Sequence, residues 1–109
     1  MSEPDRLSVD LSRAMQSEAT IAAMAERFKT LGDPTRLMIL ALLFEGERGV
    51  GDLAAHLDVS QSAVSHQLRI LRAFDIVRFR KEGREVFYAL ADDHVRDILL
   101  QTLEHILFD

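Results

Sequence analysis

The sequence predicts a mainly α-helical domain that carries one β-hairpin, an α+β fold. Two patterns lead to this prediction. Apolar side chains recur every three or four residues over most of the chain, which is typical of amphipathic helices. Between Val77 and Leu90 the period changes to two and Glu82-Gly83 interrupts the alternation, as in a hairpin. A chain of 109 residues is the size of one domain, so residues 1–109 are assigned to a single domain.

Two helices are expected in the N-terminal half, after a flexible segment over residues 1–7. Apolar residues keep helical spacing from Ser8 to Leu31, with Ser17 as the place where this helix could break. Asp33-Pro34 predicts the start of the next helix, because Asp is a good N-cap and Pro suits the first helical position. Residues 37–44 are nearly all apolar, so this second helix is expected to be central and buried.

The middle of the chain predicts a helix-turn-helix over residues 50–74. A short amphipathic helix fits Val50 to Leu57, and Ser60 is a candidate N-cap for a helix from Gln61 to about Phe74. Two short helices joined by about three residues, the second with a polar outer face, are typical of this motif. A basic hairpin follows over residues 76–90, so the whole indicates a winged helix-turn-helix.

A last helix is expected over residues 92–108, and it is too apolar to be a free tail. The chain has no cysteine, which excludes disulfides, thiolate metal sites and cysteine nucleophiles. The longest apolar run, residues 37–44, is far too short to span a bilayer, so we expect no membrane contact and a cytoplasmic protein. No Gly-rich phosphate loop or Ser-His-Asp spacing points to an enzyme. A metal hydrolase is the one chemical alternative, and it would need an open metal position.

The charge distribution indicates double-stranded DNA as a partner, although the net charge is −5. Residues 60–90 hold six basic and three acidic side chains, while the segments on either side are net acidic. An anionic polymer would be attracted by the middle segment and repelled elsewhere. The residues expected to contact bases or phosphates lie on the second helix of the motif and on the wing: Ser60, Gln61, Ser62, Ser65, His66, Arg69, Arg80, Lys81 and Arg84.

Several segments together resemble the ArsR/SmtB family over roughly residues 20–107: Leu31–Leu37, Val50–Ala54, Val59–Arg72 and Arg80–Tyr88. The stretch Ser62-Ala63-Val64-Ser65-His66-Gln67-Leu68 is the most specific part of this similarity. The resemblance implies a homodimeric winged-helix repressor that metal ions or other inducers release from operator DNA. It also implies that the first and last helices form the dimer interface.

Two histidines on the last helix suggest where an inducer could bind. His94 and His105 are eleven residues apart, which is about three turns, so both face the same way about 16.5 Å apart along the axis. One chain therefore cannot bring both to one ion, but two antiparallel copies across a two-fold axis can. Asp92 converges with His94 only if it lies at the helix cap, outside the regular helix.

The family resemblance gives this cluster a chemical meaning. Asp92, His94 and His105 match the start of the last-helix motif of the family's zinc, cobalt and nickel sensors. The fourth ligand of that motif is replaced by Phe108, and Asp109 or water could take its place. Gly49 stands near the family's cysteine site, so thiolate-seeking ions such as lead, cadmium, arsenite and copper(I) are unfavourable. Zn²⁺ is expected first, then Co²⁺ or Ni²⁺.

Simpler readings of the same residues stay open. Asp92 or Asp93 could serve only as a helix cap, and the two histidines could be ordinary polar residues beside a dimer seam. The repressor could also have a non-metal inducer or none. A dimeric interaction module without operator specificity is a further alternative, against which the arginine-rich wing and the intact polar helix argue.

Overall fold

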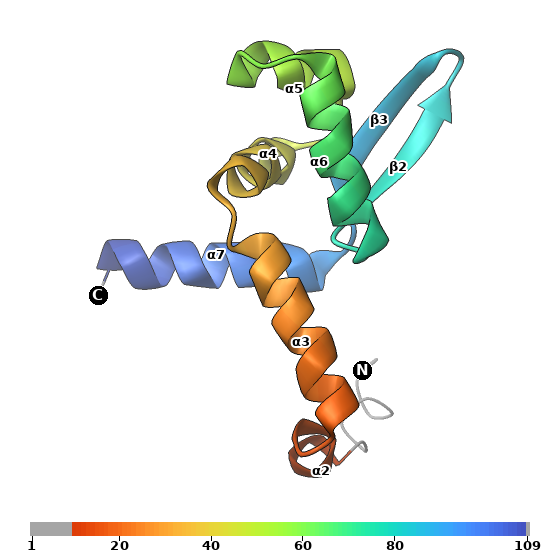
Figure 1. The fold of residues 1–109 in the computed structure, drawn as a ribbon. Helices are drawn as coiled ribbons and strands as arrows, with labels where there is room; N and C mark the ends of the chain where they lie inside the picture. The colour runs from red at the N-terminus through yellow and green to blue at the C-terminus, as the bar shows by residue number, and fades with distance from the viewer. Residues whose placement is uncertain (1–9, 109) are drawn as a thin grey trace, which may run out of the picture.

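The computed structural model describes residues 10–108 (Figure 1), so the predicted flexible segment over residues 1–7 and the candidate ligand Asp109 lie outside the described residues. Its elements follow in order: α2 Leu11–Met15, α3 Glu18–Leu31, α4 Pro34–Glu45, β1 Arg48–Gly49, α5 Val50–Leu57, α6 Gln61–Ala73, β2 Val77–Glu82, β3 Glu85–Leu90 and α7 Asp93–Phe108. The expected α+β fold with one hairpin is confirmed.

Side-chain caps set the starts of the helices where the sequence places them. Ser17 separates α2 from α3, and its hydroxyl accepts a hydrogen bond from the backbone of Thr20 at 3.3 Å. The Asp33 carboxylate accepts from the backbone of Arg36 at 3.0 Å at the start of α4. Each cap satisfies a backbone N–H that has no partner inside its own helix, so these polar residues locate the helix boundaries.

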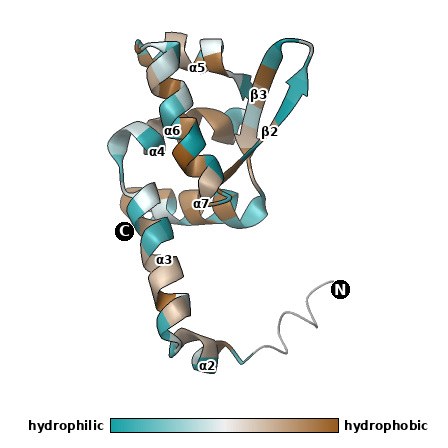
Figure 2. Cartoon of the chain, turned by 45° about the vertical axis from the view of Figure 1, so that its right-hand side comes forward, coloured by the Kyte–Doolittle hydropathy of each residue, from teal (hydrophilic) through white to brown (hydrophobic). Residues whose placement is uncertain are grey.

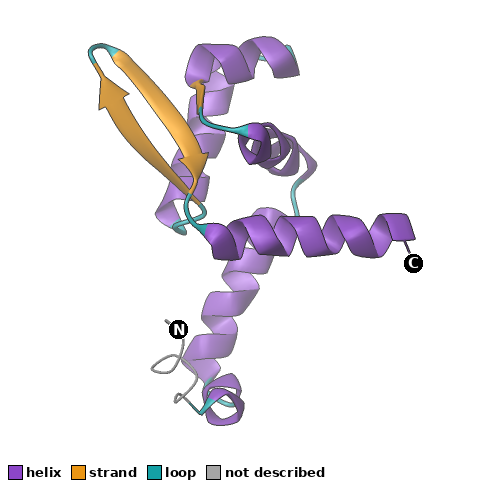
Figure 3. Cartoon of the chain, turned by 180° about the vertical axis from the view of Figure 1, so that it is seen from behind, coloured by secondary structure: helices purple, strands orange, loops and turns teal. Residues whose placement is uncertain are grey.

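The sheet has three antiparallel strands in the order β1-β3-β2. Strands β2 and β3 form the predicted hairpin, and Gly83 in its turn has a φ of +65°, which favours glycine. The short strand β1 was not predicted, because two residues are too few to show a period. Figure 3 shows the hairpin projecting from one side of the helices, with β1 at its inner edge. Strand β1 therefore joins the start of α5 to the wing.

The core lies between α4, α5, α6 and the base of the hairpin. Its largest fully buried side chains come from the three helices: Ile39, Leu40, Leu53, Val64, Leu68 and Leu71. Ile76, Val77 and Leu90 extend this cluster to the base of the wing. Burying one such aliphatic side chain contributes about 1.5–3 kcal/mol, so this cluster holds the helix-turn-helix and the wing as one unit.

Helix α4 is buried on one face only, so the expectation of a fully buried helix over residues 37–44 is wrong for the other face. Leu37 and Met38 are 41% and 51% exposed, whereas Ile39 and Leu40 are completely buried. The physical reason is that α4 joins the core formed with α5, α6 and the hairpin through Ile39, Leu40 and Leu43, whereas Leu37 and Met38 lie outside that core. The other face of α4 is apolar but uncovered.

Most of α3 and the C-terminal half of α7 extend away from the core (Figure 1), which Leu31, Val95 and Leu99 contact. Helix α7 has no buried residue, and brown apolar segments alternate with polar ones along it and along α3 in Figure 2. The Cα radius of gyration is 15.8 Å, against about 13 Å for a compact domain of about this length. No helix among residues 10–108 has both the length and the apolar character needed to cross a membrane.

Shortening Leu68 to alanine should lower the free energy of unfolding by about 2–5 kcal/mol, because its side chain is completely buried and the cavity left in the core would refill only in part. Urea denaturation followed by circular dichroism measures this loss. Arg69→Ala, an exposed change on the same helix, should stay within about 0.5 kcal/mol of the parent. Equal losses for the two variants would contradict the described packing of α6.

Candidate nucleic-acid interface and metal centre

Helix α6 has a buried face and an exposed polar face. Val64, Leu68 and Leu71 are buried against the core. Ser62, His66 and Arg69 are exposed at spacings of four and three residues, so they share the opposite face. Ser65 is half-buried at the edge of that face. The predicted contact residues in the body of α6 thus form one continuous outward surface.

The N-terminal end of α6 lies next to the wing. The Ser60 hydroxyl accepts a hydrogen bond from the backbone of Ala63 at 3.0 Å, so its first role is to cap α6. The amide of Gln61 lies beside Gly51 of α5, with Nε2 3.4 Å from the position that a Cβ on Gly51 would take. Gln61 and Arg84 line one hollow of about 560 Å³ between α5, α6 and the hairpin. Two of the predicted contact residues therefore meet at the same end of the molecule.

Arginine side chains connect α6 to α4 and to β2. Arg36 on α4 donates from Nε to Oε1 of Gln67 at 2.9 Å and from Nη1 to the carbonyl of Thr30 at 3.4 Å. At the other end of α6, the guanidinium of Arg72 lies 3.8 Å from the centre of the Phe79 ring on β2. These contacts fix the orientation of α6 relative to α3, α4 and the wing.

The cations of the wing have different surroundings. Lys81 and Arg84 are exposed, and neither forms an ion pair with another residue of the range 10–108. Arg80 instead donates two hydrogen bonds to Glu47, Nε to Oε2 at 2.9 Å and Nη2 to Oε1 at 2.8 Å. Sequence reasoning missed Glu47 because the two partners are 33 residues apart and no local spacing connects them.

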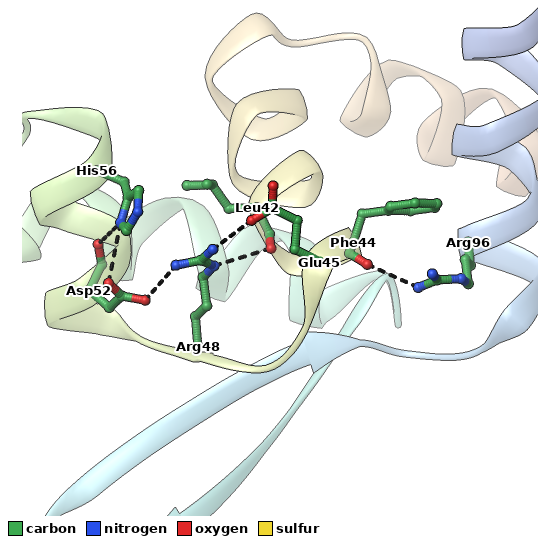
Figure 4. A network of polar contacts seen from close by, with 7 residues as sticks. All are labelled: Leu42, Phe44, Glu45, Arg48, Asp52, His56 and Arg96. Atoms are coloured by element: carbon green, nitrogen blue, oxygen red, sulfur yellow. Dashed lines mark hydrogen bonds and ion pairs between the residues drawn. The ribbon is translucent and has the colours of Figure 1, made fainter.

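Arg48 joins the end of α4 to the start of α5 (Figure 4). Arg48 donates to Asp52 Oδ2 at 2.7 Å, to Glu45 Oε1 at 2.6 Å and to the carbonyl of Leu42 at 3.2 Å. The hydrogen bonds to Asp52 and Glu45 raise the pKa of its guanidinium. His56, one turn further along α5, has Nδ1 3.0 Å from the backbone oxygen of Asp52. Acidic residues three before and four after Arg48 are the sequence signal for this network.

Helix α7 is connected to the same region. Arg96 donates from Nη1 to the carbonyl of Phe44 at 3.0 Å (Figure 4), and its guanidinium lies 4.0 Å from the centre of the Phe44 ring. Phe44 precedes Glu45, the partner of Arg48. Polar contacts of α7 and of α5 therefore reach neighbouring residues at the end of α4, Phe44 and Glu45.

The structure brings together two of the predicted metal ligands. Asp92 lies just before α7, and its Oδ1 accepts a hydrogen bond from the backbone of Val95 at 3.1 Å, so it caps the helix. Its other oxygen, Oδ2, is 3.7 Å from Nδ1 of His94. The position outside the regular helix, which convergence with His94 requires, is thus observed. Both side chains are largely exposed and supply an oxygen and a nitrogen donor, a pair that suits borderline ions.

His105 does not join this pair within one protomer. It lies about three turns further along α7, roughly 16.5 Å away along the axis. Among the described residues, no group of three or more His, Cys, Asp or Glu side chains is close enough to hold an ion. A three-ligand site from these residues therefore needs a second copy of the chain.

Replacing Asp92 should separate its capping role from its charge. Asp92→Ala should lower the free energy of unfolding by about 0.5–2 kcal/mol, because the backbone of Val95 loses its acceptor. Asp92→Asn should stay close to the parent, since asparagine caps helices about as well as aspartate. Chemical denaturation in the presence of a chelator measures both. An asparagine variant as unstable as the alanine variant would show that capping is not what Asp92 contributes.

Known proteins with similar sequences identify the family of this chain. Residues 33–78 match the model of a family described as bacterial regulatory protein, arsR family. The transcriptional repressor SmtB homolog of Synechocystis is 42% identical over 104 residues, which cover 95% of this chain and 72% of that protein. The cadmium resistance transcriptional regulatory protein CadC homolog of Staphylococcus aureus is 40% identical over 83 residues, covering 75% of this chain and 69% of that protein.

A solved structure supports the same assignment at the level of the fold. The homodimeric winged helix-turn-helix DNA-binding domain Mb0332 of Mycobacterium bovis, a possible ArsR-family regulator, is similar with a TM-score of 0.75 at 31% identity. The similarity covers 84% of this chain and 91% of that one. These relatives are transcriptional regulators rather than enzymes. The chain belongs to the ArsR/SmtB family of winged helix-turn-helix transcriptional repressors.

Proposed function

We propose that this protein is a cytoplasmic homodimeric repressor that binds operator DNA through α6 and the wing and is released by a divalent transition metal, Zn²⁺ first. The observation that carries the proposal is the exposed cationic surface of α6 and the hairpin on a chain whose net charge is −5. Repulsion from the acidic remainder restricts a polyanion to this one surface.

A second copy of the chain is the partner that best fits the uncovered apolar faces. Phe28 on α3 is 60% exposed and Ile106 on α7 is 70% exposed. They line one groove of about 630 Å³ that α3, α4 and α7 enclose. Exposed apolar side chains that gather in one groove often mark a protein–protein contact. Pairing of α3 and α7 with their counterparts would bury it, and the similar Mb0332 domain is a homodimer.

A two-fold dimer would present two copies of α6 to one face of DNA. Dimeric helix-turn-helix proteins place such helices in successive major grooves, about 34–36 Å apart. We assign base contacts to Gln61 and Ser62, because the N-terminal turn of this helix is the part that reaches base edges. Lys81 and Arg84 would contact phosphates. The remaining side chains of the surface would position the helix on the backbone: Ser60, Ser65, His66 and Arg69.

The inducer site would lie between the two α7 helices. Asp92 and His94 of one chain would hold the ion together with His105 of the partner subunit, and Asp109 or water would complete the set. Nitrogen and oxygen donors fit Zn²⁺, and Co²⁺ or Ni²⁺ after it. The ion would supply a fixed crosslink between the two helices, and it can shift the dimer only by its differential affinity for two shapes. Couplings of this kind are typically about 1–3 kcal/mol.

The contacts around α7 could transmit a movement at the proposed inducer site to the DNA-binding helix α6. Arg96 ties α7 to the end of α4, and Arg48 ties the end of α4 to α5. A change in the angle between the two α7 helices would therefore move α5 and α6 with them. The two copies of α6 would then no longer match successive grooves.

Gln61→Ala should weaken binding to an operator, isolated by selection from random duplexes, by about 1–3 kcal/mol, because a bidentate contact to adenine is lost. Binding to random DNA should change little. Lys81→Gln is the matched control: it should weaken both DNAs alike and flatten the dependence of log K on log salt by about 0.9 per lost phosphate contact. Fluorescence anisotropy measures both. An equal loss on both DNAs for Gln61→Ala would place Gln61 among the phosphate contacts.

Zn²⁺ titration of the dimer should saturate near one ion per chain, and binding should weaken in acid, because protons compete with the ion for the imidazole nitrogens. His105→Ala should abolish metal-driven release from DNA and leave metal-free DNA binding nearly intact. Heterodimers of His94→Ala and His105→Ala chains should bind one ion, since one interface keeps all its ligands.

Two results would contradict this site. A heterodimer that binds no ion, while the parent binds two, would exclude a cross-subunit site. DNA binding that none of the three ions affects would exclude metal as the inducer, leaving a repressor with another inducer or none. The first result is read by calorimetry and the second by anisotropy.

A further inference from the structure

Arg80, which charge alone would place among the DNA contacts, is already engaged by a carboxylate of its own chain. Glu47 meets its guanidinium edge-on with two hydrogen bonds of 2.9 Å and 2.8 Å. A carboxylate bound in this way occupies the fork of donors that a DNA phosphate would use. Glu82 approaches a third nitrogen, Nη1, at 3.4 Å.

The sheet holds Glu47 and Arg80 in this position. Glu47 immediately precedes β1, whereas Arg80 lies on β2, and β3 runs between these two strands. Phe87 on β3 is the cross-strand partner of both Arg80 and Gly49. The guanidinium of Arg80 lies 4.8 Å from the centre of the Phe87 ring. The ion pair therefore extends across the middle strand over an aromatic surface and is fixed at both ends.

The Glu47–Arg80 ion pair has no net charge, whereas the neighbouring side chains Lys81 and Arg84 each carry a positive charge. The hydrogen bonds from Arg80 lower the pKa of the Glu47 carboxyl, so Glu47 stays ionised at neutral pH. The side chains of Arg80 and Glu47 are 49% and 38% exposed, so a phosphate approaching Arg80 meets both charges at once. Lys81 and Arg84 carry no such counter-charge among the described residues.

We propose that Glu47 masks Arg80 from DNA and thereby sets the number of phosphates that each wing neutralises. The inference rests on the proposed DNA binding by the wing. Arg80 then acts as a strut between β1 and β2, and Lys81 and Arg84 remain as the phosphate contacts. Each phosphate that a protein neutralises adds about 0.9 to the slope of log K against log salt, so the masking is measurable.

The test uses the full-length protein, a fluorescein-labelled duplex of random sequence and a series of salt concentrations. Glu47→Gln should tighten binding and steepen the salt dependence by about 0.9 per engaged wing, because a neutral amide frees Arg80 for a phosphate. The double variant Glu47→Gln/Arg80→Gln should return to the parental slope, since it removes both charges of a neutral pair. Glu85→Gln is the matched control: it removes one exposed charge from the wing without releasing Arg80.

Each outcome decides the proposal. A Glu47→Gln slope equal to that of the parent or of Glu85→Gln overturns it, as does a double variant flatter than the parent, which would mean that Arg80 binds phosphate in the parent protein. Far-ultraviolet circular dichroism shows that each variant is folded, and the double variant gives an answer even if the single one is unstable. A parent protein with no salt-dependent DNA binding would instead overturn the proposed function.

Discussion

The structure depends on apolar surface that one chain cannot bury by itself. Phe28 on α3 and Ile106 on α7 are largely exposed and line one groove, and no residue of α7 is buried. The buried core belongs to α4, α5, α6 and the base of the hairpin, and α7 packs against it only through the partly buried Val95 and Leu99. In the proposed dimer, α3 and α7 supply the contact between the two chains, and the spacing of the two α6 helices follows from how they pair.

Several arginines near the DNA-facing surface are already bound by oxygen atoms of the same chain. Three arginines bind carbonyl, amide or carboxylate oxygens of the same chain: Arg36, Arg48 and Arg96. Their hydrogen bonds fix α4, α5, α6 and α7 relative to one another. Arg80 is neutralised by Glu47, whereas Arg78, Lys81 and Arg84 have no ion-pair partner among residues 10–108, and Arg78 donates to the carbonyl of Ala91. A count of basic residues in the sequence overstates the charge that a phosphate would meet.

Local signals in the sequence predicted most of the fold. Asp33 and Ser60 marked helix starts because capping depends only on residues a few positions away, and the change of period marked the hairpin. The contacts that local spacing does not contain were missed: β1, the pairing of Glu47 with Arg80, and the exposed face of α4. The outward face of α6 followed from helical spacing. The sequence allowed Asp92 to lie either in the last helix or at its cap, and only the cap position brings it close to His94. Adding His105 to this pair would require a second chain.

We expect α3 and α7 to pair two copies of this chain, and sedimentation equilibrium at micromolar concentration tests this pairing. The parent protein should have a mass twice the 12.3 kDa of one chain. A folded Ile106→Glu variant should have the mass of one chain, because its carboxylate would be buried at the interface. A parent protein of 12.3 kDa throughout the concentration range would contradict it.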